Sequence, residues 1–311
     1  MRVSRAGIIA LITFIVFSGT GCNFWNQIKA RQNLVDGAKA YSDKKFDDAE
    51  ALFRDAVQRD PSNQLGQLFL ARTLHSQFAA NRNMPQKADE AVAEYRKVVP
   101  EYKQEVARKK QALDGNPNDE KARREYNDTL TILNSSISAV ANLLDNTNKP
   151  DEWKSWQSEI ANDAGLPNET RAAAFTSMAA KENTCANDIT GVEPVRKTVK
   201  GADGKDEYQY VKPTDTKIYE DLKGCIQRGT ELIDKALNLD KNSDSIWSYK
   251  TSLLIQDMRV AEMDGRKEDE ARLKTEAENA KAEFSRLAEI KRKAKESEEE
   301  ERKKREEEAK K

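Results

Sequence analysis

The chain has 311 residues, of which 34% are charged and only 7% are aromatic, and its formal net charge is −1. This composition favours exposed helices over sheets, and the length suffices for one extended repeat array or two compact domains. A net charge this close to zero gives no overall field that attracts nucleic acid or an acidic membrane surface.

The first segment has the organisation of an export signal. Arg2 and Arg5 precede an apolar stretch, residues 6–17, and four small residues, 18–21, then lead to Cys22. About a dozen apolar residues match the core of a signal peptide and fall short of the roughly 20 that cross a bilayer as a helix. The sequence therefore predicts a signal segment that ends before the cysteine.

Residues 20–22 resemble the lipobox of bacterial lipoproteins, in which a small residue directly precedes the lipid-modified cysteine. Gly19 departs from that pattern, because the family usually has leucine or another aliphatic residue there. The resemblance implies removal of the signal peptide, acyl chains such as palmitate on Cys22 and, with Asn23 after it, transfer to the outer membrane. A lipidated linker over 22–30 would follow. Simple cleavage with secretion and an uncleaved anchor are the alternatives.

The stretch "NLVDGAKAYSDKKFDDAEALFRDAVQRDPSN" carries small, aromatic and proline residues in a fixed order, namely Gly37, Phe46, Ala49, Phe53, Ala56 and Pro61. This order and spacing resemble the tetratricopeptide repeat (TPR), although Tyr41 falls one residue later than the family's usual aromatic. The resemblance implies a two-helix hairpin. Its small residues allow close approach, its phenylalanines fill the space between helices, and its proline stops the second helix.

The pattern continues through residues 31–185, which we predict to form TPR and TPR-like helical hairpins. Apolar and small residues stand at first-helix positions over 71–74, and a longer turn leads to a second-helix triad closed by Pro100, namely Ala91, Tyr95 and Val98. After Pro117, apolar residues recur at helical spacing as far as Leu144 without the signature residues.

A second patch of the pattern predicts C-terminal TPR-like hairpins over 218–290. There "IDKALNLDKNSDSIWSYKTSLL" aligns with "FRDAVQRDPSNQLGQLFLARTL", so that Ala236 stands in the place of Ala56. Trp247 supplies a bulky residue near the start of the next first helix, and Lys241 replaces the expected proline. The predicted fold class is therefore all-α, a TPR-type helical-hairpin solenoid.

Residues 186–217 interrupt the helical pattern. Apolar and polar residues alternate on both sides of a Gly-Ala-Asp-Gly tip, which predicts a β-hairpin inserted between two helices of one repeat. Its Tyr208 and Tyr210 are candidates for a partner contact. The alternative is that the hairpin lies against the array without binding anything.

If the protein is exported and lipidated at Cys22, then Cys185 and Cys225 are left as a pair in an oxidising compartment. We expect a disulfide between them at the base of the inserted hairpin. It would close a loop of about 40 residues and add roughly 3–4 kcal/mol in the loop-entropy model. Two buried thiols that never meet are the alternative.

Residues 291–311 are almost entirely charged and contain acid-before-base pairs at a spacing of four residues. Each such pair adds about 0.2–0.5 kcal/mol, so the segment can be helical without a core. No apolar heptad is present, which argues against a coiled coil. We predict a charged helical tail that extends the last helix into solvent, with a binding arm for a charged partner as the alternative.

Catalytic and metal-binding signatures are not found. Phosphate-binding, nucleophile-elbow and zinc-protease motifs are all missing from the sequence. The one histidine, His75, falls on a predicted first helix, where a packed or surface role is expected, and a His/Cys metal site is improbable. Neither enzyme activity nor a cofactor is expected.

A TPR solenoid implies a concave surface, lined by first helices, that accepts an extended or helical segment of a partner. On that surface we expect Asn33, Lys39, Gln67 and Arg72. The resemblance implies a lipid-anchored scaffold at the periplasmic face of the outer membrane that binds envelope proteins or their peptide segments, by analogy with TPR lipoproteins of barrel and pilus-secretin assembly. The alternatives are a structural spacer between membrane and cell wall and an accessory subunit of an envelope enzyme.

Overall fold

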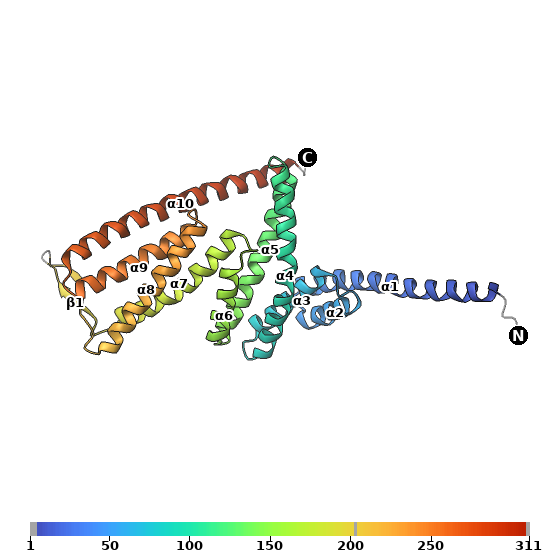
Figure 1. Cartoon of the computed structure of the whole chain (residues 1–311), viewed down its shortest axis with the longest axis horizontal. Helices are drawn as coiled ribbons and strands as arrows, with labels where there is room; N and C mark the ends of the chain where they lie inside the picture. Colours follow the sequence, from blue (N-terminus) through green and yellow to red (C-terminus); the bar gives the residue numbers. More distant parts are fainter. Residues whose placement is uncertain (1–4, 202–203, 309–311) are drawn as a thin grey trace. The chain divides into compact units, whose positions relative to one another are not determined.

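The predicted all-α helical solenoid with a small β-hairpin is confirmed. A computed structural model describes residues 5–201 and 204–308, and these residues form ten helices and one two-stranded antiparallel sheet. The chain divides into two compact units, residues 1–153 and 154–311. Figure 1 shows that each unit is built mainly from helices, with the strand β1 in the second unit.

The first unit contains five helices in which neighbours in sequence also pack against each other. Their bounds are α1 (Arg5–Ser42), α2 (Phe46–Arg59), α3 (Gln64–Ala80), α4 (Pro85–Gly115) and α5 (Glu120–Asn146). A further helix, α6 (Pro150–Asn162), begins at the end of this unit. The turn after α2 contains Pro61, as predicted from the repeat pattern.

Residues 22–30, predicted to be a linker, are helical. They lie within α1, contain neither glycine nor proline, and end at Ala30, which is fully buried. Residues 1–4 of the predicted signal segment lie outside the described residues, and so does the side chain of Cys22. No helix in the described part of the chain is both long enough and apolar enough to cross a membrane.

The signature residues of the first hairpin pack as the repeat pattern predicts. Ala49, Phe53 and Ala56 of α2 are all buried, with Phe53 fully inaccessible to solvent. A Cβ atom added at Gly37 of α1 would lie 2.7 Å from the Phe53 ring, so a side chain there would collide with it. Tyr41 lies against Phe46, with ring centroids 5.5 Å apart. Tyr41 therefore packs within the hairpin although it stands one residue later than the aromatic of the repeat pattern.

The predicted helix end at Pro100 is wrong, because α4 continues through this residue to Gly115. A proline inside a helix costs about 3 kcal/mol or more through its missing N–H and its ring. Here the apolar spacing does not stop at the proline. Tyr102 and Val106 are both buried, on the part of α4 that precedes α5. Their burial offsets the cost of the proline and keeps the helix intact.

The second unit places the inserted hairpin between two packed helices, as predicted. Its elements are α7 (Asn168–Thr190), β1 (Arg196–Lys200), β2 (Asp206–Tyr210), α8 (Thr216–Leu239), α9 (Asp244–Met263) and α10 (Lys267–Glu308). The strands pair with Arg196 opposite Tyr210. The insertion is shorter than the predicted 186–217, because α7 continues to Thr190. Residues 202–203 at its tip lie outside the described residues.

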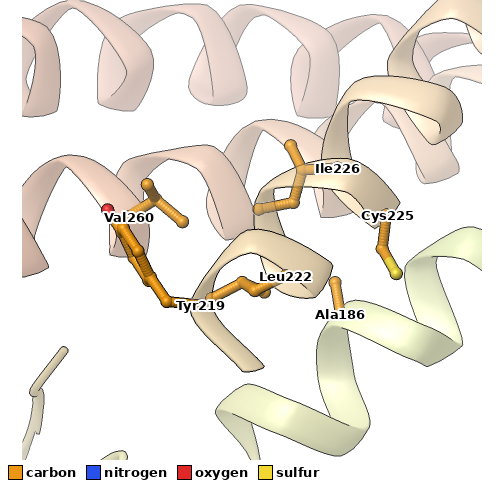
Figure 2. Close-up of a cluster of buried hydrophobic side chains, with 6 residues drawn as sticks. All are labelled: Ala186, Tyr219, Leu222, Cys225, Ile226 and Val260. Atoms are coloured by element: carbon orange, nitrogen blue, oxygen red, sulfur yellow. The ribbon is translucent and has the colours of Figure 1, made fainter. Parts of the chain in front are cut away.

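A small apolar cluster joins α7, α8 and α9. Figure 2 shows Leu222 and Cys225 of α8 near Ala186 of α7, with Val260 of α9 on the other side of the cluster. Cys225 forms a disulfide with Cys185, and their Cα atoms are 6.1 Å apart. The bond therefore joins α7 to α8 beside this core and closes the segment of chain that contains the hairpin.

The last helix consists of a packed half and a charged half. Up to Leu287, α10 buries apolar residues, several of them in a cluster with Leu254 and Ala261 of α9. From Ile290, which is 53% exposed, the helix continues to Glu308 with charged side chains. Ion pairing with Arg292 lowers the pKa of Glu289 to about 2. The predicted charged helical extension is present, and residues 309–311 lie outside the described part.

Candidate functional site

Two of the residues predicted to face a groove are used in packing between helices. The side-chain amide of Asn33 on α1 donates to the Asp55 carboxylate on α2. The side-chain amide of Gln67 on α3 donates to the Glu94 carboxylate on α4. Both bonds hold neighbouring helices together, so these amides are not free to bind a partner.

The other two predicted groove residues of the first unit differ in exposure. The guanidinium of Arg72 is half-buried and lies 5.9 Å from the centroid of the Phe69 ring. Lys39 is exposed and lines an open depression of about 470 Å³ between α1 and α2, together with Asp36 and Asp48. Of the four, Lys39 is thus placed at a surface hollow.

His75 is part of the packing between α3 and α4. Its imidazole lies edge-on to the Tyr95 ring, with 6.1 Å between centroids. Burial, together with the nearby Arg82 guanidinium, lowers the pKa of His75, and burial raises the pKa of Tyr95 to about 12. Burial is the larger cause of both shifts. Within the described residues no group of three or more metal-ligating side chains is found.

The inserted hairpin lies on α9, and Tyr210 makes the contact. The Arg259 guanidinium is 4.5 Å from the centroid of the Tyr210 ring, and the Tyr210 backbone N–H donates to Glu262 Oε1 at 3.1 Å. Tyr208 remains 60% exposed, with the Arg196 guanidinium 4.8 Å from its centroid. Of the two predicted contact tyrosines, only Tyr208 is available to a partner.

A groove between α7 and α9 was not predicted from the sequence. These two helices are the first helices of consecutive hairpins, α7–α8 and α9–α10, and they also contact each other. An open hollow of about 310 Å³ lies over them, lined by Glu169, Ala172, Ala173, Thr176, Ser177, Ala180, Asp240, Ser243, Ser245 and Tyr249. The α7 members recur at spacings of three and four, which places them on one helix face.

The groove is lined mainly by small side chains and hydroxyl groups. The Thr176 hydroxyl donates to the Ala172 carbonyl at 2.7 Å and is thereby satisfied. Among the described residues, the hydroxyls of Ser177, Ser245 and Tyr249 have no hydrogen-bond partner. Small side chains let another backbone approach closely, and unpaired hydroxyls can bond to its amides. The surface therefore suits a polypeptide segment.

Buried polar contacts fix α7 relative to α9 beyond the groove. Gln256 of α9 is 2% exposed; its Oε1 lies 2.9 Å from the Thr190 hydroxyl, and its amide donates to Asn187. Arg259 Nη1 donates to the same Thr190 hydroxyl at 3.1 Å. Such a network is stabilising only when its members are bonded, which requires one spacing of the two helices. These bonds hold the C-terminal part of α7 against α9.

Comparison with known proteins gives little functional information. No protein-family model matches the chain, and no curated protein matches it in sequence. It is similar to a solved structure of the hypoxic regulator of sterol synthesis Nro1, described as a nuclear import adaptor. The identity is 9% and the TM-score 0.35, over 85% of this chain and 89% of that chain. Similarity at this level carries no argument about function.

Proposed function

We propose that the protein is a lipid-anchored interaction scaffold of the bacterial cell envelope, whose α7–α9 groove holds a segment of another envelope protein. The observation that carries the proposal is the row of small residues and unpaired hydroxyls between two first helices. Helical-hairpin arrays use this surface for binding extended segments.

The location at the envelope is supported by the N-terminal sequence. A short apolar stretch and four small residues precede Cys22, as in lipoprotein precursors. Palmitate and related acyl chains on that cysteine would hold the scaffold at the periplasmic face of the outer membrane. The scaffold would bind other proteins during assembly of a larger complex, such as an outer-membrane or pilus-secretion complex. No catalysis is proposed.

The groove proposal is tested by filling the groove. Ala173→Trp places an indole on its exposed α7 face, whereas Ala271→Trp makes the same change at an exposed site on α10 outside the groove. Each chain is crosslinked in the cells that produce it, purified and identified with its partners by mass spectrometry. We expect one envelope protein to be recovered with wild type and Ala271→Trp, and about tenfold less with Ala173→Trp, a loss of about 1.4 kcal/mol.

Thermal unfolding checks that both variants remain folded. Equal recovery of the same partner by all three folded chains would refute binding in the groove. Loss of recovery only on deletion of residues 291–311 would favour the alternative of a spacer, since the charged end of α10 would then make the contact.

A further inference from the structure

The exposed face of α1 carries large apolar side chains that nothing in the first unit covers. Phe24 is 65% exposed, Trp25 60% and Ile28 38%. Three such side chains within five residues form an apolar patch of the kind that marks an interaction surface. This patch, formed by Phe24, Trp25 and Ile28 of α1, is called the α1 patch below.

The α1 patch lies opposite the side on which α1 packs. Asn26 faces α2, since its side-chain Oδ1 accepts from Arg59 Nη1 at 3.4 Å, and Ala30, one turn further along, is fully buried. Phe24 and Ile28 are also one turn apart. Each lies two residues from Asn26, a rotation of about 200° around the helix axis, which puts them on the side away from α2. Folding of this unit therefore leaves the patch free.

A lipid bilayer fits the α1 patch because of what precedes it. The patch begins two residues after Cys22, so acyl chains on that cysteine would hold it at the bilayer surface. Aromatic side chains concentrate at membrane–water interfaces. Trp and Phe on one face of a helix are typical of segments that bury this face at the boundary between headgroups and acyl chains. Arg31, exposed on the next turn, can reach headgroup phosphates.

We infer that Phe24, Trp25 and Ile28 insert into the membrane interface beside the lipid-bearing end of α1. The inference rests on the proposed anchoring at Cys22 and adds a function for the adjoining helix. Acyl chains alone leave a protein free to swivel, whereas an inserted helix face fixes the direction in which α1 leaves the membrane. The scaffold would thus be oriented at the membrane as well as attached to it.

Fluorescence quenching by brominated lipid tests the insertion. Full-length protein is extracted from membranes and its acylation is determined by intact mass. It is then placed in vesicles of phosphatidylethanolamine and phosphatidylglycerol, with or without bromine on the acyl chains near the headgroup. The difference in emission between wild type and Trp25→Phe isolates Trp25 from the other tryptophans. We expect this difference to vanish in brominated vesicles and to persist in plain ones.

A second variant reports on the rest of the α1 patch. Phe24→Ser with Ile28→Ser leaves Cys22 and Trp25 in place, and we expect it to be acylated normally but to restore Trp25 emission in brominated vesicles. Equal Trp25 emission of the wild type in both kinds of vesicle would overturn the inference, and a second copy or a partner helix would then cover the patch. A chain without acyl mass refutes the lipid anchor instead, and the quenching still decides the insertion.

Discussion

Phe53→Ala is expected to lower the free energy of unfolding of the first unit by about 3–5 kcal/mol, the range found for a buried phenylalanine truncated to alanine. Phe53 is fully buried and stacks on Phe69 of α3, with centroids 5.4 Å apart. It also fills the space that Gly37 of α1 leaves open. One ring of α2 therefore packs against both α1 and α3, and its removal leaves a cavity between the three helices.

Urea unfolding followed by circular dichroism measures this loss. Phe46→Ala is the matched control, because Phe46 begins the same helix and is only half-buried, at the edge of Tyr41. We expect the control to lose less than half as much stability. A loss for Phe53→Ala no greater than that of Phe46→Ala would mean that the first hairpin is not organised around this ring.

Replacement of both Cys185 and Cys225 by alanine is expected to lower the unfolding free energy of the second unit by roughly 3–4 kcal/mol. The bond joins residues 40 positions apart, and loop closure of that length gives this value in the chain-entropy model. Alanine is preferred to serine because Cys225 is buried beside Leu222, where a hydroxyl would lack a partner. The loop that gains freedom contains the whole β-hairpin.

The measurement is again the urea midpoint, here compared between the double variant and the wild type with and without reductant. Reduced wild type and the double variant should unfold at similar midpoints, both below that of the oxidised wild type. If both cysteines of the non-reduced, denatured wild type react with an alkylating reagent, the bond does not form in the purified protein and the expectation fails.

The hairpins were predictable because their signature residues act locally. Phe53 and Ala56 stand at helical spacing, and Pro61 follows shortly after them. The position and the end of α2 can therefore be predicted without knowledge of the rest of the fold. The continuation of α4 through Pro100 was not predictable in this way. A proline is a local signal, and burial of Tyr102 and Val106 is a tertiary one that outweighs it.

The candidate site was less predictable than the fold. Asn33 and Gln67 are polar residues on first helices. Each donates a hydrogen bond to a carboxylate on a neighbouring helix, and this contact can be seen only in the packed structure. The groove on α7 was missed because alanine and serine at helical spacing are also typical of tightly packed helices. Whether such a face is covered depends on how α9 lies beside it, and the sequence of α7 does not determine that.

Crosslinking from inside the groove tests the central claim most directly. A photoreactive amino acid is placed at position 177 of α7, in the groove, and at position 271 of α10 as the control. Illumination of cells should join the position-177 chain to one envelope protein through a short segment of that protein, and should give no such product from position 271. Products that are absent from position 177, or identical from both positions, would contradict a groove that binds a partner.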